Sequence, residues 1–381
     1  MIKLNIAILG TRGVPAMYGG FETCAEEVSV ELAKRGHKVS VYGRKGNYND
    51  SLEYFKDVRL YHMPRIKGKV TETFSNTLFS MFHAIFQNYD IIYVMNAANS
   101  PLCIIPWMLG KKVVINVDGL EWRRKKWGPV AKKYYQFAEY LSTKFSSRII
   151  SDSMGIKEYY LERYKTDSTF IAYGAQIESS TNPDILKEYN LEPEGYFFVA
   201  SRLEPENNAD ITVKAFEKVK TDKKLVIAGG ANYKSEYIEK IRETKDDRII
   251  FLGPVYKDGH IKELHCNCYA YVHGNEVGGT NPALLKALGY GNTTLALNVN
   301  FNSEVVQGAG ILYEKNADDL ALKMQQLVDD EELTRSFRPK AVNRILEAYT
   351  WEKISNEYED YFLELSGKQK GKLELNLNTA T

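Results

Sequence analysis

Residues Val272 to Asn292 read VHGNEVGGTNPALLKALGYGN. The stretch starts at the end of an apolar run, passes through two adjacent glycines and then becomes helical in pattern. Asn281 suits the position that caps a helix, and Pro282 suits the first helical turn, where no backbone N–H is needed. The stretch therefore predicts a strand, a glycine loop and a helix in succession, with the unpaired N–H groups of the helix start available to an anion.

The same unit recurs along the chain, because short apolar, β-branched runs alternate with turn residues and helical patterns. This alternation predicts doubly wound parallel sheets. The runs form two series, separated by a polar stretch around Gln176 to Gly195. The first series is Ile6 to Leu9, Lys38 to Tyr42, Ile91 to Val94, Lys112 to Val117 and Arg148 to Ser151, and the second is Tyr196 to Ala200, Lys224 to Ala228, Arg248 to Leu252, Tyr269 to His273 and Thr294 to Leu297.

A chain of 381 residues is longer than a domain with a single hydrophobic core usually is. We therefore expect an α/β protein with two Rossmann-like lobes facing each other across a cleft. The expected boundaries are 1–177 for the first lobe and 178–347 for the second. Residues 348–367 are expected to form a helix that packs back on the first lobe, and 368–381 a polar tail.

A second glycine loop, GTRGVPAMYGGFE, follows the first expected strand. It supplies Gly10, Gly13, Gly19 and Gly20, with Arg12 as a cation, ahead of a helix that ends at Gly36. The G-x-G-x-x-G spacing of a dinucleotide-binding loop is absent. Tight turns alone explain Gly10, but they explain the pair at the helix start less well.

The bulk composition excludes several classes of protein. A net charge of +1 gives no general reason to expect a nucleic-acid partner. The apolar stretch at the start is too short for a signal peptide or an anchor, and four scattered cysteines fit a reducing compartment, so we expect a cytoplasmic protein. His260, His265, Cys266 and Cys268 cluster in sequence, but NCYAYVHG alternates like a buried strand that places Cys266, Cys268, Ala270 and Val272 on one face, and we expect no metal there.

The loop chemistry favours a diphosphate ligand. Gly278 and Gly279 let the backbone approach an anion at the helix start, and Glu276 is placed to accept hydrogen bonds from hydroxyls of an attached neutral group. Arg202, in ASRLEPENN, follows the first strand of the second lobe and suits phosphate oxygens. A surface salt bridge from Arg202 to Glu204 or Glu206 is an equally good interpretation of that segment alone.

Five motifs in order, YGGFET, DGLEWRRKKWG, AYGA, RLEPENN and HGNEVGGTNPALL, resemble the retaining family-4 glycosyltransferases of GT-B fold. The resemblance covers nearly the whole chain. It is specifically to the bacterial rhamnosyltransferases that build capsule and cell-wall polysaccharides. It implies transfer of a sugar, such as L-rhamnose from dTDP-rhamnose, onto a lipid-linked saccharide in the cleft between an acceptor-side lobe and a donor lobe, without a metal or other cofactor.

Site residues carry over from the resemblance one by one. Arg202 becomes the diphosphate cation, Glu276 contacts the donor sugar, and Asp118 orients the acceptor hydroxyl or the reacting sugar. Glu121 is a weaker candidate for the same face as Asp118. The remaining implied donor-binding residues are Arg12, Gly13, Gly19, Gly20, Asn207, Val255 in the loop Gly253 to Lys257, and the backbone of Gly278, Gly279, Thr280 and Asn281.

Two positions depart from the family pattern. Asn207 replaces a lysine that many relatives have near the diphosphate. Lys286 replaces the glutamate that usually binds the ribose hydroxyls, and a lysine has donors but no acceptor. Three explanations are open: a deoxyribose donor that lacks the 2′-hydroxyl, a Lys286 contact to phosphate, or a weakened or inactive copy. A solvated helix residue is the simplest alternative to all three.

The segment EWRRKKWGPVAKKYYQF, Glu121 to Phe137, has six cations and five aromatic residues. This composition suits an anionic membrane surface, and a solvated helix face is the alternative. With the resemblance, it predicts a protein bound peripherally to the inner face of the plasma membrane. The implied acceptor and membrane residues are Glu121, Trp122, Arg123, Arg124, Lys125, Lys126 and Trp127.

Two rival functions remain. A nucleotide-sugar epimerase also has Rossmann-like lobes and a nucleotide diphosphate site. The segment Glu121 to Phe137 counts against it, because an epimerase has no lipid acceptor. A catalytically weakened scaffold that binds nucleotide sugar or a partner enzyme is favoured by Lys286. The sequence does not identify the donor base and sugar, the acceptor sugar, the linkage or the oligomeric state.

Overall fold

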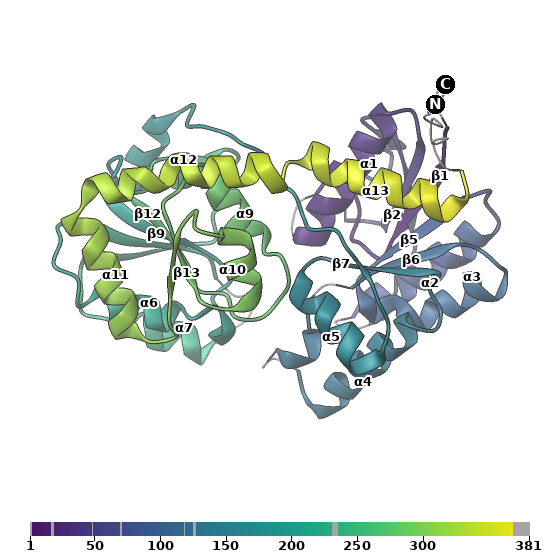
Figure 1. The fold of residues 1–381 in the computed structure, drawn as a ribbon, viewed down its shortest axis with the longest axis horizontal. Helices are drawn as coiled ribbons and strands as arrows, with labels where there is room; N and C mark the ends of the chain where they lie inside the picture. The colour runs from purple at the N-terminus through teal and green to yellow at the C-terminus, as the bar shows by residue number, and fades with distance from the viewer. Residues whose placement is uncertain are drawn as a thin grey trace, which may run out of the picture.

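The computed structural model describes residues 2–16, 19–47, 49–68, 71–117, 119–124, 127–230 and 235–368. Two parallel β-sheets with helices on both faces form two lobes that lie side by side along the long axis of the molecule (Figure 1). The expectation of a two-lobed α/β fold is therefore confirmed.

The first sheet has eight strands in the order β3-β4-β2-β1-β5-β6-β7-β8. Every neighbouring pair is parallel except β3 with β4, which form a short antiparallel hairpin. The five strands expected from sequence form the centre of this sheet and one side of it, and β3, β4 and β8 are additions. The strands are β1 (Asn5–Leu9), β2 (Lys38–Arg44), β3 (Tyr54–Phe55), β4 (Val58–Met63), β5 (Ile91–Met95), β6 (Val113–Val117), β7 (Arg148–Ser151) and β8 (Thr169–Phe170).

The two faces of this sheet are covered by different helices. Helices α1 (Gly20–Lys34) and α13 (Trp351–Ser366) pack on one face, against side chains such as Ile8 and Tyr93. The opposite face has α2 (Thr71–Ile85), α3 (Ile104–Met108), α4 (Pro129–Ser142), α5 (Met154–Tyr164) and the 3₁₀ helices η1 (Ala97–Cys103) and η2 (Glu121–Arg123). Both faces are thus buried, which accounts for the continuous apolar runs of the strands.

The second sheet has six strands, all parallel, in the order β11-β10-β9-β12-β13-β14. Its strands are β9 (Tyr196–Ala200), β10 (Lys224–Ala228), β11 (Ile249–Gly253), β12 (Ala270–His273), β13 (Thr294–Leu297) and β14 (Ile311–Tyr313). Its helices are η3 (Pro183–Tyr189), η4 (Pro205–Asn207), α6 (Ala209–Phe216), α7 (Glu236–Ile241), α8 (His260–Cys266), α9 (Pro282–Gly289), α10 (Asn300–Val306), α11 (Ala317–Asp329) and α12 (Glu331–Ala348). All five strands expected here are present, and β14 is an addition.

The strand alternation predicted over NCYAYVHG is wrong at its start. Cys266 is the last residue of α8, and β12 begins at Ala270. Asn267 closes the helix, since its N–H donates to Glu263 O at 3.1 Å. Cys268 is buried in the turn that follows, so the two cysteines do not share a strand face.

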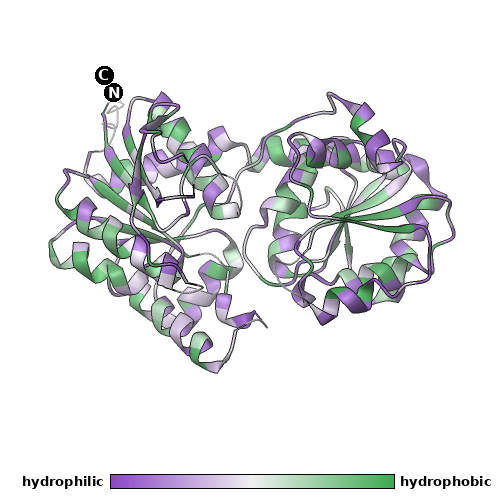
Figure 2. Ribbon diagram, turned by 180° about the vertical axis from the view of Figure 1, so that it is seen from behind, coloured by the Kyte–Doolittle hydropathy of each residue, from purple (hydrophilic) through white to green (hydrophobic). Residues whose placement is uncertain are grey.

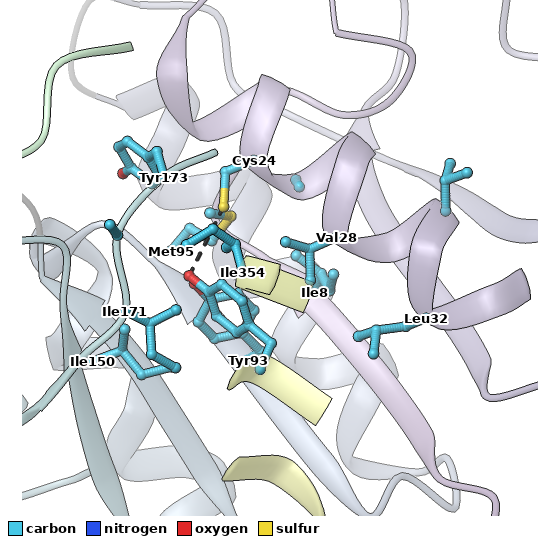
Figure 3. Packing of buried hydrophobic residues seen from close by; sticks show 14 of the residues in the cluster. Ile8, Cys24, Val28, Leu32, Tyr93, Met95, Ile150, Ile171, Tyr173 and Ile354 are labelled. Carbon is cyan, nitrogen blue, oxygen red and sulfur yellow. Dashed lines mark hydrogen bonds between the residues drawn. The ribbon is translucent and has the colours of Figure 1, made fainter. Parts of the chain in front are cut away.

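After α12 the chain returns to the first lobe, where α13 lies beside α1 (Figure 1). The hydroxyl of Tyr358 lies 2.9 Å from that of Tyr93, and Asn116 Nδ2 donates to the Tyr93 hydroxyl at 3.1 Å. Figure 3 shows this packing, with Cys24, Val28 and Leu32 of α1 and Ile354 of α13 around Ile8, Tyr93 and Met95. The first core is thus completed by the C-terminal part of the chain.

The chain crosses between the lobes twice, and the two crossings lie against each other. Ala175 N donates to Tyr349 O at 2.7 Å, and Ala175 forms an isolated parallel bridge with Thr350. Gly174 packs on the ring of Trp351, since a methyl group at this glycine would lie 2.6 Å from Trp351 Cδ2. Two paired segments rather than one flexible linker therefore join the lobes.

Candidate active site

The glycine loop before α9 has the geometry predicted from sequence. Asn281 caps the helix, since its side-chain oxygen accepts from Ala283 N at 2.9 Å, and Pro282 is the first helical residue. Gly278 has a φ of +151°, a conformation that side chains disfavour, and the space where a side chain would project is open. The backbone N–H groups at the start of α9 thus lie beside loop residues that have no side chains, so that an anion could approach them.

This loop contacts the first lobe at the carboxyl end of β7. A methyl group at Gly279 would lie 2.0 Å from Asp152 Oδ1, so only glycine fits beside the Asp152 carboxylate. The hydroxyl of Thr280 donates to Asp152 O. Gly119, after β6, is also close, since a methyl group there would lie 3.3 Å from Gly278 Cα. The carboxyl ends of the two sheets therefore face each other across this loop.

The first glycine loop meets the same helix from the other side. Gly19 has a φ of +100° and precedes α1, and a methyl group at Gly20 would lie 2.8 Å from Pro282 Cγ. Arg12 N donates to Glu22 Oε1 at 3.1 Å, which fixes the loop on the first turn of α1, and the Arg12 side chain is exposed. Gly13 lies against β2, since a methyl group at Gly43 would lie 3.0 Å from Gly13 Cα. Two loops 260 residues apart in sequence thus converge on one helix start.

Glu276 is held by neighbours in the second lobe. Its carboxylate forms an ion pair with Lys315, which follows β14, and accepts from Asn208 Nδ2 at 3.3 Å. Its backbone N–H donates to Glu206 O at 3.0 Å. The side chain retains 17 % exposure, so the carboxylate is oriented without being sealed from solvent.

Arg202 is exposed, and among the described residues its guanidinium pairs with neither Glu204 nor Glu206. The salt-bridge interpretation of this segment is therefore not what the structure shows. Asn207 is buried and donates from Nδ2 to Arg202 O at 2.7 Å, so it shapes the backbone that presents Arg202. Val255, after β11, is half-buried against the apolar cluster around Phe198 and Tyr271.

Lys286 lies in the second turn of α9, and its side chain is exposed. Its positive charge acts on His265, a buried histidine of α8 whose ring Nδ1 lies 2.9 Å from Asn292 Oδ1. Burial, together with this charge, lowers the pKa of His265 to about 4. The lysine therefore adds positive potential to the face of the second lobe between α8 and α9.

The segment after β6 is folded on itself. Glu121 pairs with Arg124 at 2.6 Å and accepts from Trp127 Nε1 at 3.1 Å. Trp122 packs partly into the apolar cluster on the other face of the first sheet, and Arg123 is exposed. Asp118, Lys125 and Lys126 lie outside the described residues.

Four residues of this region are not predicted from the sequence: Asp152, Asn208, Glu304 and Lys315. Asp152 directly follows an expected strand, and a carboxylate in that position is a signal that could have been used. Glu304 accepts from Met154 N at 3.1 Å and so joins α10 to the start of α5 across the lobes. Burial raises the pKa of Glu304. In the described part of the chain, no group of three or more His, Cys, Asp or Glu side chains is arranged to hold a metal ion.

Comparison with protein families gives two matches that divide the chain between them. Residues 182–375 match the family described as glycosyl transferases group 1, and residues 3–176 match a domain of unknown function (DUF1972). N-acetyl-alpha-D-glucosaminyl L-malate synthase of Bacillus anthracis is 27 % identical over 195 residues. That alignment spans 49 % of this chain and half of the relative's length.

Solved structures share the fold over nearly the whole chain. Sucrose-phosphate synthase from Thermosynechococcus elongatus superposes with a TM-score of 0.78 at 17 % identity, covering 96 % of this chain and 100 % of that one. Anabaena HepE, solved with UDP and glucose, gives a TM-score of 0.76 at 16 % identity, covering 95 % and 100 %. The arrangement of two facing parallel sheets is thus the GT-B arrangement.

Proposed function

Because the chain belongs to the glycosyl transferases group 1 family, we propose that it moves L-rhamnose from dTDP-rhamnose, with retention, onto a lipid-diphosphate-linked saccharide in bacterial surface polysaccharide synthesis. The observation that carries the proposal is the meeting of both glycine loops at the start of α9, on the edge where the two sheets face each other. Arg202 and Glu276 follow β9 and β12, which are neighbours in the second sheet. The rhamnose donor and the lipid-linked acceptor come from the motif resemblance.

The donor is held by charge and backbone. Arg202 and the N–H groups from Gly278 to Asn281 neutralise the diphosphate, with the positive end of α9 behind them. The free oxygen of Glu276 accepts from hydroxyls of the donor sugar. Val255 contacts the base, and the first glycine loop, Arg12 included, closes over the phosphates from the other lobe.

The reaction needs no base from the protein. The bond from the anomeric carbon to the diphosphate oxygen breaks, a bond to the acceptor oxygen forms on the same face, and the leaving diphosphate takes the proton of the acceptor hydroxyl. Asp118 orients that hydroxyl. The protein accelerates the reaction by holding the reactants together and by stabilising the negative charge that grows on the leaving group.

Thermal stabilisation by candidate donors tests the proposal directly. The purified protein is melted with dTDP, dTDP-rhamnose, UDP, UDP-glucose, GDP or NAD. A ligand at a hundred times its dissociation constant adds about 2.7 kcal/mol to the folded state. We expect stabilisation by dTDP-rhamnose, none by NAD, and loss of the effect in Arg202→Met, because the proposed diphosphate cation is removed. Among the described residues none pairs with the Arg202 guanidinium, so this change should leave the fold intact.

Product analysis then separates the rival functions. Transfer of the sugar to a lipid-diphosphate saccharide, with the anomeric configuration determined by NMR, is expected. Conversion of the donor sugar without an acceptor would identify an epimerase. Donor binding without turnover would identify a scaffold, the reading that Lys286 favours. An inverted product would contradict retention.

A peripheral membrane location is part of the same proposal, since the acceptor is a lipid. Charge reversal of Arg123, Arg124, Lys125 and Lys126 is expected to abolish sedimentation with anionic vesicles. Undiminished sedimentation would show that this segment does not contact the membrane. In the described part of the chain, no helix is long and apolar enough to span a bilayer.

A further inference from the structure

Helix α2 exposes its phenylalanines, although it buries Met81 and Ala84 together with several polar residues, which is unusual for a surface helix. Asn76 Nδ2 donates to Gly43 O at 3.2 Å and to Met63 O at 3.1 Å, so the polar side chains satisfy strand carbonyls beneath the helix. The buried polar residues are Ser75, Asn76, Thr77 and Ser80, and the exposed aromatic ones are Phe74, Phe79, Phe82 and, directly after the helix, Phe86. Phe86 is 82 % exposed.

The apolar surface continues over α3 and α4. Two contacts join the three helices: Lys111 Nζ donates to Gln87 O at 3.1 Å, and the rings of Trp107 and Phe145 lie 5.4 Å apart. Figure 2 shows apolar residues along these outer helices of the first lobe. We call this surface the α2–α4 face; it consists of Phe74, Phe79, Phe82, Phe86, Trp107, Met108, Leu109, Val130, Phe137 and Tyr140.

An exposed apolar surface of this extent marks an interaction site rather than ordinary surface. Met108 is 72 % and Val130 84 % exposed, so each projects well beyond the helices that support it. The exposed residues of α4 fall on one side of that helix, because Val130, Phe137 and Tyr140 follow the helical period. The exposed apolar residues of the face therefore point outward from the helices that carry them.

The segment of the chain that carries this face is strongly basic in sequence. Residues 65–148 contain 13 lysines and arginines against 5 aspartates and glutamates, although the whole chain has a net charge of +1. Two of the described acids pair with cations of the same stretch, Glu72 with Arg65 and Glu121 with Arg124, whereas Asp90 pairs with Lys368 and Glu139 is buried against Tyr159 and Tyr164. Lys133 and Lys144 stay exposed, and Lys144 Nζ lies 5.3 Å above the Tyr140 ring.

We infer that the α2–α4 face docks this protein on an anionic lipid bilayer. The phenylalanines and Trp107 enter the headgroup region, and the surrounding lysines contact lipid phosphates. A second copy of the chain is a poorer occupant, because two such faces would bring like charges together. The inference rests on the proposed function in one respect: docking would give the protein access to its lipid-linked acceptor.

The path of the chain connects this face to the candidate active site. Gly119 lies against Gly278 of the donor loop, and α4 begins at Pro129, ten residues later. A lobe resting on the bilayer through α2, α3 and α4 therefore has the acceptor side of the site a short length of chain away from the lipid surface. This placement differs from docking through residues 121–127 alone, where Trp122 is partly inside the core.

Flotation with vesicles of phosphatidylcholine, with or without phosphatidylglycerol, tests the inference on the full chain. We expect binding to the anionic vesicles that weakens as salt is added. The triple variant Phe82→Ser, Phe86→Ser, Met108→Ser should lose about tenfold or more in partition coefficient, because three exposed apolar anchors are removed. Lys133→Gln with Lys144→Gln should weaken binding to anionic vesicles and leave the residual binding to neutral ones unchanged.

Leu322→Ser with Leu346→Ser is the matched control, since both leucines are exposed on α11 and α12 of the other lobe. This variant should bind vesicles as the unmodified chain does. Unchanged binding by the triple variant would overturn the inference. So would a dimer in sedimentation velocity that the triple variant converts to monomer, because the face would then belong to a second copy.

Donor-induced stabilisation, measured on the same samples, separates this inference from the proposed function. The triple variant should melt like the unmodified chain and be stabilised equally by dTDP-rhamnose. If no donor stabilises any sample while flotation responds as expected, the proposed function fails and the docking face stands.

Discussion

The hydroxyl of Thr280 donates a hydrogen bond to the backbone carbonyl of Asp152, and the Asp152 carboxylate rests against Gly279. The glycine loop of the second lobe is thus seated directly on the carboxyl end of β7 in the first. The loop that we propose for the donor diphosphate thus also contacts the first lobe. If the loop binds the donor as proposed, donor binding and the distance between the lobes are coupled.

Gly279→Ala should force the lobes apart, because the added methyl group would lie 2.0 Å from Asp152 Oδ1. We expect a larger radius of gyration in small-angle X-ray scattering and loss of donor-induced stabilisation. Gly155→Ala is the matched control, since a methyl group there meets nothing within 4 Å. Adding Asp152→Ala to the Gly279 variant should restore the compact form, and a double variant as expanded as the single one would disprove the steric account.

Lys286→Glu should tighten donor binding, because the family resemblance implies that a carboxylate at this position of α9 would accept hydrogen bonds from ribose hydroxyls. A gain of about tenfold is expected for UDP-glucose, and a smaller one for dTDP-rhamnose, whose deoxyribose lacks the 2′-hydroxyl. Titration calorimetry measures both. Lys220→Glu, at an exposed position after α6, makes the same charge change away from the site and should alter neither affinity.

The Lys286→Glu variant has a second readout, which is the pKa of His265. Lys286 contributes to lowering the pKa of this histidine, so replacing the positive charge by a negative one should raise that pKa, as followed by the imidazole NMR signal across a pH titration. An unmoved signal would show that the Lys286 charge does not reach His265.

Stability should fall as the pH drops below about 6.5. Burial lowers the pKa of His265 to about 4 and that of His273 to about 3. Between these values and the ordinary histidine pKa of about 6.5, the unfolded chain binds more protons than the folded one, so the free energy of unfolding decreases with falling pH. Each histidine contributes a loss of about 2 kcal/mol from pH 7 to pH 5.

Urea denaturation at pH 7 and pH 5 measures this loss. His265→Gln should remove about half of the part due to the two histidines and keep a side chain able to donate to Asn292. If the variant loses as much stability as the unmodified chain between the two pH values, His265 is not a source of the pH dependence.

Tyr358→Phe should destabilise the first lobe by about 1–3 kcal/mol, because the buried hydroxyl of Tyr93 and the amide of Asn116 both lose a partner. Denaturant unfolding followed by the fluorescence of the aromatic residues measures the loss. Tyr361→Phe, in the same helix, should cost less, since its hydroxyl lies outside this network and bonds to Ile149 O at 3.5 Å and to Thr169. Equal losses would show that burial, rather than the shared network, sets the cost.

The parts of the fold that follow from local pattern were predictable from the sequence. Strands such as β6 and β12 are buried on both faces and appear as unbroken apolar runs, and the capped start of α9 was visible in Asn281 and Pro282. The β3–β4 hairpin was missed because two-residue pairings leave almost no pattern. Helix α2 gave no usable signal, since apolar residues lie on both of its sides: the phenylalanines face outward, whereas Met81 and Ala84 are in the core.

The site residues that the sequence did not predict were missed for a different reason. Asp152 and Gly279 are 127 positions apart, and Glu276 meets Lys315 only because β12 and β14 are placed on either side of β13 in the second sheet. Such contacts depend on strand order and on how the lobes sit, which no local spacing encodes. Arg202 was ambiguous for the opposite reason, because its neighbours Glu204 and Glu206 offered a local partner that the structure does not use.

The return of α13 to the first lobe constrains how this protein is made. The face of the first sheet that α1 covers is completed only by residues 351–366, which leave the ribosome after the whole second lobe. The first lobe is thus synthesised first, but its core is completed last. Until α13 has been made, Tyr93 and Cys24 lack the residues that bury them. A fragment ending near residue 177 would therefore not be a folded half of this protein, whereas the second lobe has all of its strands in one uninterrupted segment.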